Sequence, residues 1–356
     1  MPHGGIEDFL AVRWYDGLLV RSEHLSHSDR RVAALFSQVA KVALDQPGVA
    51  YVEADSSIGS QLVEITSSGY TEDRQGVEIV LDVTRPFRGI TAEGGLLLGI
   101  PTKRGVPGVP LAAPRALIAQ APGSPTEYLV CARQELDERL SLRKQGAPGA
   151  QGQPIELAYP ALRVEMVAPE QYRTRLFQDL GDSIPIAAVK AEGDKAEVDT
   201  TFIPPVTSLR VAGAFNVDLV ATLARALQEL CQMSTEYLAA GGHVLSRGDT
   251  SVELRTRYNF YLVLNAILLA KAGLLRNLED LSPLRLLGDV IYPLSQWFDR
   301  YYEGVKERRT PLTNLSGISS KIGKFSQADV LTRTDGLVKT CLEFVSGVSD
   351  SIREVA

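Results

Sequence analysis

The sequence predicts an α+β chain, in which an N-terminal β-sandwich or barrel is followed by an all-α helical bundle. Short apolar runs with turn residues between them recur from residue 48 to residue 202, as strands do in sandwiches and barrels. After residue 206 the apolar residues recur every three or four positions, which is the spacing of one side of a helix. Between the halves lies the run from Asp199 to Val206, which contains Pro204 and Pro205. Neither a strand nor a helix should continue through it, because each proline fixes φ and lacks an N–H.

Composition limits the possible function classes. The chain has 356 residues, 45% of them hydrophobic, and a formal net charge of −6, so it can bury a core and has the length of about two domains. Its acidic balance argues against nucleic acid as a partner. Its three cysteines are odd in number and far apart, which favours a reducing cytosol over a disulfide framework or zinc cluster. No secretory signal is expected at the N-terminus.

The first half reads as follows. Residues 11–20 resemble two extended pieces joined at Asp16-Gly17, a dipeptide suited to a tight turn. Residues 22–44 have helical apolar spacing. The Gly- and Pro-rich residues 145–154 should form a surface loop. Strands are expected at residues 48–54, 61–66, 77–83, 96–101, 115–120, 127–133, 155–166, 184–190 and 198–202.

Few residues in the first half suggest chemistry. His24 and His27 have a spacing that can place two imidazoles on one helical face, but no carboxylate or thiol stands at ligand spacing. A surface or capping role is therefore favoured over a metal site. No Ser/His/Asp constellation can be built from four histidines. The sequence thus predicts no catalytic, cofactor-binding or metal-binding residues, and no small-molecule substrate.

The second half begins with a helix from residue 217 that should end at Gly241-Gly242, and continues with a helix over residues 251–281. Residues 258–270 are apolar nearly all round, which is typical of a helix inside a bundle. This run is too short to span a bilayer. Asn259 and Asn265 would then need polar partners, unless they face a wet groove.

Ser282-Pro283 should start the next helix, which Pro293 should kink and Gly304 should end. Residues 306–324 are expected to be a loop. Ser326, with Asp329 three positions later, should open the last helix. The helix from residue 217 and the helix that starts at Ser282-Pro283 each carry an apolar stripe. These stripes could pack within one chain or join several copies, and the sequence leaves both interpretations open. The residues of this seam are Val220, Leu223, Leu227, Leu230, Leu287, Ile291, Leu294 and Phe298.

Three stretches resemble one family, TssK, the baseplate subunit of bacterial type VI secretion systems. Residues 14–25 are similar to its N-terminal motif, with Ser22-Glu23 standing where Pro-Gln is usual. Residues 201–205 are similar to its Phe-Ile-Pro-Pro junction, and residues 259–269 to its Leu-Leu-Asn core helix. By this resemblance, the N-terminal motif implies a partner-binding or packing role for Trp14, Asp16, Gly17, His24 and Leu25. The junction motif implies an interdomain joint at Phe202, Ile203, Pro204 and Pro205.

The resemblance implies a β-rich shoulder over residues 1–205, a helical neck over 206–325, and a C-terminal helix over 326–356 that packs on the bundle. The head domain that the family carries after the neck is expected to be missing. The resemblance also implies that the protein is a homotrimer and not an enzyme. The trimer would link baseplate wedge proteins like TssF and TssG to a membrane complex like TssL and TssM, in part through a separate adaptor. It would be cytoplasmic and associated with the baseplate docked at the inner membrane.

The runner-up hypothesis is a β-rich enzyme or binding module that acts on carbohydrate and carries a helical oligomerisation tail. A cleft with two carboxylates whose pKa values are pushed apart would favour the enzyme.

Overall fold

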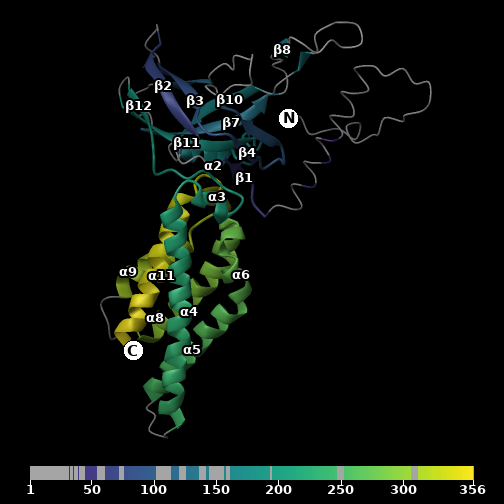
Figure 1. Cartoon of the computed structure of the whole chain (residues 1–356). Coiled ribbons are helices and arrows are strands. Elements are labelled where there is room, and N and C mark those ends of the chain that lie inside the picture. Colours follow the sequence, from purple (N-terminus) through teal and green to yellow (C-terminus); the bar gives the residue numbers. More distant parts are fainter. Residues whose placement is uncertain are drawn as a thin grey trace, which may run out of the picture. The chain divides into compact units, whose positions relative to one another are not determined.

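The computed structural model divides the chain into two compact units, Met1–Pro205 and Val206–Ala356. The first is built of antiparallel sheets and the second of helices (Figure 1), so the predicted α+β class, with a β-rich half before a helical half, is confirmed. The structure describes residues 32, 35, 39, 45–53, 61–71, 76–101, 114–119, 126–135, 142–143, 156–157, 161–192, 195–246, 252–305 and 312–355.

The first unit contains sheets with the strand orders β2-β3-β6, β10-β7-β11-β12, β1-β4-β5 and β8-β9. Strand β2 lies beside β12, and β6 lies beside β10, so both edges of the sheet β2-β3-β6 meet the edges of the four-stranded sheet, as in a barrel. The strands are β1 (Gly48–Val52), β2 (Val63–Tyr70), β3 (Gly76–Val83), β4 (Phe87–Ile90), β5 (Leu96–Gly99), β6 (Arg115–Ala119), β7 (Glu127–Glu135), β8 (Leu142–Arg143), β9 (Glu156–Leu157), β10 (Ala161–Val167), β11 (Ser183–Glu192) and β12 (Lys195–Val198).

Strands β7 and β11 form the core of this unit. Residues 183–189 of β11 are buried in succession, as expected for a strand covered on both faces. Helix α2 (Pro169–Arg175) contributes the buried ring of Tyr172 and contacts β7. On β7, burial raises the pKa of the Cys131 thiol well above its usual value. These apolar strands therefore hold the smaller sheets and α2 in place.

Several local predictions for this unit are wrong. The expected strand over residues 198–202 does not form, because β12 ends at Val198 and a turn begins at Asp199. The described residues of the long strand expected over 155–166 belong to two strands in different sheets, since Glu156–Leu157 (β9) pairs with β8 and Ala161–Val167 (β10) pairs with β7. Strand β4 and helix α2 were not predicted from the sequence. Strand β4 has only four residues, which include an arginine and a glycine, so its sequence shows too little alternation of apolar and polar residues to predict a strand.

In the second unit, α4 packs against both α5 and α11 (Figure 1). None of the described helices is both long and apolar enough to cross a lipid bilayer. The helices are α3 (Leu209–Gly213), α4 (Val217–Ser246), α5 (Val252–Ala270), α6 (Ala272–Arg276), η2 (Leu278–Asp280), α7 (Pro283–Arg285), η3 (Leu286–Ile291), α8 (Tyr292–Val305), α9 (Leu312–Ile322), α10 (Gln327–Val330) and α11 (Asp335–Val355).

Two helix ends differ from prediction. Helix α4 runs through Gly241-Gly242 to Ser246, because glycine costs a helix only about 1 kcal/mol per residue and does not remove an N–H as proline does. The single helix expected over residues 251–281 breaks at Lys271, whose φ of −101° and ψ of 4° leave the helical region, and continues as α6 and η2.

The irregularity expected at Pro293 takes the form of π-helical turns over Leu286–Ile291, directly before α8. Proline cannot donate a hydrogen bond to the carbonyl four residues earlier, and a π-helical segment is one known way in which a helix adapts. At the start of this region, Ser282 caps the helix by accepting a hydrogen bond from the Arg285 N–H, as its sequence suggests.

The loop expected over residues 306–324 is wrong, since α9 occupies most of it. This helix is tied to α8 by a buried polar contact: Ser319 Oγ lies 2.6 Å from Ser295 Oγ and donates to Asp299 Oδ1 at 2.8 Å. The capping box at Ser326 and Asp329 is confirmed. The helix that it opens, α10, ends at Val330, and the long final helix α11 begins at Asp335.

Candidate interaction surfaces

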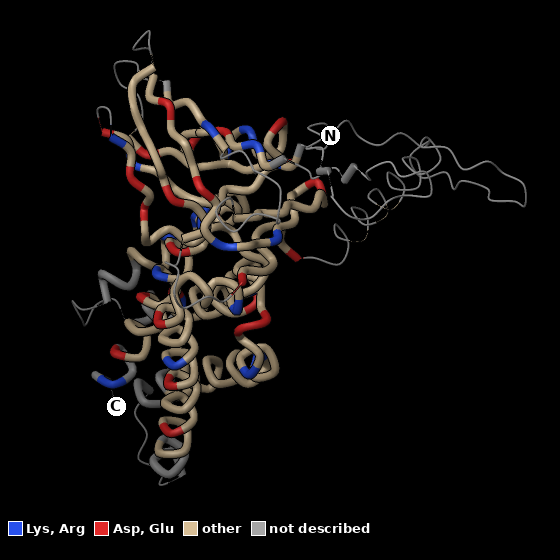
Figure 2. Tube along the Cα trace, turned by 45° about the horizontal axis from the view of Figure 1, so that its top comes forward, with Lys and Arg blue, Asp and Glu red and all other residues tan. Residues whose placement is uncertain are grey.

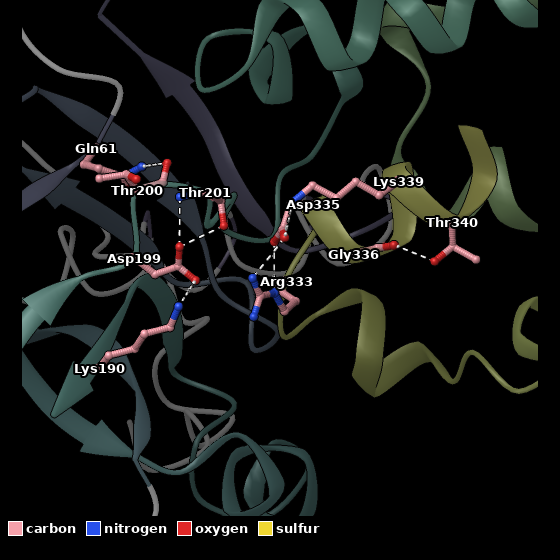
Figure 3. A network of polar contacts seen from close by, with 10 residues as sticks. All are labelled: Gln61, Lys190, Asp199, Thr200, Thr201, Arg333, Asp335, Gly336, Lys339 and Thr340. Atoms are coloured by element: carbon pink, nitrogen blue, oxygen red, sulfur yellow. Dashed lines mark hydrogen bonds and ion pairs between the residues drawn. The ribbon is translucent and has the colours of Figure 1, made fainter. Parts of the chain in front are cut away.

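The joint at the end of the first unit is held by hydrogen bonds within that unit. The Asp199 carboxylate accepts from the backbone N and the hydroxyl of Thr201 at 2.9 and 2.8 Å, forming an Asx turn. From the loop before β2, Gln61 Nε2 donates to the Thr200 carbonyl at 2.8 Å. Lys190 of β11 lies 3.9 Å from the same Asp199 carboxylate (Figure 3). Two separate segments of the sheet region, the loop before β2 and strand β11, thus contact the residues that enter the joint.

The joint itself is buried. Phe202 is 0% exposed and Ile203 is 2% exposed, and the two prolines that follow are buried as well. The Pro205 carbonyl accepts a hydrogen bond from the Val49 N–H of β1 at 2.8 Å, so the second proline is tied to the edge of a sheet. These contacts differ from those of an exposed Pro-rich linker, because the segment contributes apolar side chains to a core.

The apolar stripes singled out from the sequence lie inside the second unit. On α4 and on η3 and α8, each of these side chains is between 0% and 5% exposed. The ring of Phe298 meets that of Phe344 on α11 edge to face, with 5.9 Å between centroids. The stripes therefore pack within one chain and are not free to contact a second copy. Their residues are Val220, Leu223, Leu227, Leu230, Leu287, Ile291, Leu294 and Phe298.

Helix α5 presents an apolar face to solvent, which contradicts the prediction that it is buried all round. Tyr261, Leu264 and Leu268 point inward and are 0–2% exposed. On the opposite side Leu262, Val263 and Leu269 are 49%, 50% and 65% exposed. The helix packs against α4 and α8, and two neighbours cover only part of its circumference. The uncharged outward face, named here the α5 face, consists of Asn259, Leu262, Val263, Ala266, Leu269 and Ala270.

The two asparagines of this helix have different surroundings. Asn265 donates through its side-chain nitrogen to Ser234 Oγ and Thr235 Oγ1 on α4, at 3.2 and 3.0 Å. These bonds fix the register between α4 and α5. Asn265 therefore has the polar partners that one of the two sequence-based alternatives required. Asn259, in contrast, is exposed on the α5 face.

The start of α11 is fixed by a second polar cluster (Figure 3). The Arg333 guanidinium donates to both oxygens of the Asp335 carboxylate at 2.9 Å, and Lys339 lies 3.5 Å from it. The Asp335 side chain is only 4% exposed. A carboxylate in the first turn also suits the helix dipole, so this cluster has a structural explanation.

A third charged cluster lies on the surface of the first unit. Arg175 contacts Asp179 at 2.8 Å and Glu165 at 3.0 Å. Its guanidinium holds the pKa of the Asp179 carboxyl below its usual value. Two carboxylates that share one arginine form a surface ion-pair cluster and not an acid–base pair. No group of three His, Cys, Asp or Glu side chains suited to a metal ion occurs among the described residues.

Comparison with known proteins bears on the fold. No protein-family model and no curated protein matches the sequence. A crystal structure of TssK superposes with a TM-score of 0.50 at 14% identity, over 94% of this chain and 67% of that chain. The chain has the fold of TssK. A chain of the TssK–TssF–TssG baseplate subcomplex of the type VI secretion system matches over 96% of this chain and 99% of its own length, with a TM-score of 0.48 and 14% identity. A chain of the type VI baseplate complex matches with a TM-score of 0.46 and 16% identity, over 85% of this chain and 90% of that chain.

The motifs that resemble TssK are covered unequally. The joint at residues 202–205 and the core helix at residues 259–269 lie within the described residues. The N-terminal motif, with Trp14, Asp16, Gly17, His24 and Leu25, lies outside them. The α5 face was missed because an all-apolar helix gives no sign of which side its neighbours leave uncovered.

Proposed function

We propose that this protein is a non-enzymatic TssK-type subunit of a type VI secretion baseplate, which assembles as a homotrimer and connects wedge proteins to a membrane complex. The TssK fold supports the family assignment. In this proposal the first unit is the shoulder, the second is the neck, and the protein acts on the cytoplasmic side of the inner membrane. Charged residues of both signs are interspersed over both units (Figure 2), which is typical of a surface that meets proteins and not of a nucleic-acid groove.

The α5 face is the observation that carries self-assembly. Its residues follow a heptad spacing: Asn259 and Ala266 are seven positions apart, and Leu262 and Leu269 stand three positions after each of them. The small side chain of Ala266 at one heptad position lets a second helix approach closely, and leucine at the other position supplies the apolar contact. An exposed apolar face of this kind marks an interaction site. The copy number of three comes from the family resemblance.

Light scattering tests this step. The wild-type protein should have a mass about three times the 38.7 kDa of one chain. Leu269→Asp should give a folded monomer, because the side chain is 65% exposed in one chain and a charge there disrupts only a contact between copies. Gln228→Asp, at an exposed position of α4, is the matched control and should remain trimeric. A monomeric wild type, or a trimer that tolerates Leu269→Asp, would contradict the proposal.

The wedge partners are proposed by analogy with the complex of TssK with TssF and TssG. Co-expression with the TssF- and TssG-like proteins of the same organism should yield a complex that survives size exclusion. Contact with a TssL- and TssM-like membrane complex, through a separate adaptor, is tested by following a labelled trimer in cells, which should be recruited to the inner membrane. A trimer that binds neither the wedge proteins nor the membrane complex would contradict the proposed baseplate function.

A further inference from the structure

The three-stranded sheet β1-β4-β5 has two rows of side chains on each face. In an antiparallel sheet, directly opposed residues point to the same face. One pair of rows is Val52–Phe87–Gly99 and Val49–Gly89–Leu97, whose members are all buried. The other pair, on the opposite face, is Tyr51–Arg88–Leu98 and Gly48–Ile90–Leu96. This second face is named here the outer β4 face.

The inner rows account for the packing of this sheet. An added Cβ at Gly89 would come within 2.7 Å of Ile184 Cδ1, so the inner face lies directly against β11. On the outer β4 face Tyr51 is 50% exposed, Leu96 is 44% exposed and Arg88 is exposed, whereas Gly48 is buried. Three consecutive leucines at residues 96–98 must alternate between faces, and burial of Leu97 leaves the other two outside. The apolar side chains there are not required by the core.

Arg88 lies at the centre of the outer β4 face. Its guanidinium carbon is 5.6 Å from the centroid of the Tyr51 ring, in a cation–π arrangement that holds the side chain along the sheet. Among the described residues no carboxylate forms an ion pair with Arg88. A charge held by an aromatic ring, with aliphatic side chains around it, is the composition of an interface hot spot.

We propose that the outer β4 face is the surface on which a wedge protein docks, and that the docking segment presents an Asp or Glu to Arg88 between apolar side chains. The inference rests on the proposed baseplate function. Charge complementarity selects the occupant, because a purely apolar segment would leave the guanidinium desolvated and unpaired. These residues are the centre of an interface and not its whole extent.

Binding of the cognate wedge proteins to the full-length trimer tests the proposal. Arg88→Glu and Leu96→Asp should each weaken binding by about thirtyfold or more, the size of a hot-spot loss, and Arg88→Gln should reduce the dependence of binding on salt. Lys195→Glu, an exposed charge reversal on β12, is the matched control and should bind like the wild type. Slow thiol labelling of the buried Cys131 verifies that each variant keeps its fold.

The outcomes separate this inference from the function on which it rests. If the wild-type trimer binds no wedge protein, the proposed function fails and the inference with it. If the wild type binds, and both Arg88→Glu and Leu96→Asp bind as tightly as Lys195→Glu, the outer β4 face is not the docking surface although the function stands. A change of oligomeric mass in these variants, without loss of wedge binding, would assign the face to a second copy of the chain and overturn the proposal.

Discussion

Substitution of Gly99 by alanine should destabilise the first unit, because the Phe87 ring fills the space that a Cβ would need. These residues are directly opposed on β5 and β4. An added Cβ would overlap Cε1 and Cδ1 of the ring and lie 2.5 Å from Cζ. Phe87 is 2% exposed and cannot turn into solvent without exposing its ring. Overpacking of this kind costs about 1–3 kcal/mol, which the reduced entropy of the unfolded chain offsets by about 0.4–1 kcal/mol.

The assay is the rate at which Cys131 reacts with a thiol reagent across a denaturant series. Cys131 is buried in β7 of the same unit, so it reacts only when that unit opens. Gly69→Ala, on β2, is the matched control because nothing lies within 4 Å of its added Cβ, and it should change the free energy of opening by less than about 0.5 kcal/mol.

A double-mutant cycle identifies the cause. Phe87→Leu removes the ring atoms that the new Cβ would meet, so Gly99→Ala should cost clearly less in that background. Equal costs in both backgrounds, or a Gly99→Ala variant as stable as Gly69→Ala, would refute the reasoning. The result also bears on the docking proposal, because the inner face of this sheet sets the position of its outer β4 face.

Two further predictions concern the second unit. Leu227→Asp should unfold this unit and not merely separate copies, because an unpaired charge at a position 1% exposed costs about 3–5 kcal/mol. Thiol labelling of the buried Cys341 should therefore become faster, and a folded monomer would contradict the prediction. Burial raises the pKa of the Cys341 thiol from 9.0 to about 12. The folded state therefore favours the protonated thiol, and this stabilisation is complete below pH 9 and is lost as pH rises toward 12. Cys341→Ala should reduce the fall in the free energy of unfolding above pH 9 by about 1.4 kcal/mol per pH unit, and equal slopes for the variant and the wild type would contradict this assignment.

Features that depend on neighbours along the chain were predictable from the sequence. The spacing of Val220, Leu223, Leu227 and Leu230 predicted one buried side of α4, because a helix brings residues three and four apart onto the same face. The capping box at Ser326 was predicted for the same reason, since its two hydrogen bonds join residues three apart. The change from strands to helices near the two prolines also follows from local backbone restrictions.

Only the tertiary structure decided which apolar surfaces are covered. Strand β4 has four residues and is recognisable as a strand only through its pairing with β1 and β5. The leucines at 96–98 show no alternation of polarity, so contact with the core, and not the sequence, sends Leu97 inward and its neighbours outward. Helix α5 is apolar on nearly every side, and the positions of α4 and α8 select the side that stays exposed. Burial depends on segments distant in the chain, and local periodicity carries no information about where those segments lie.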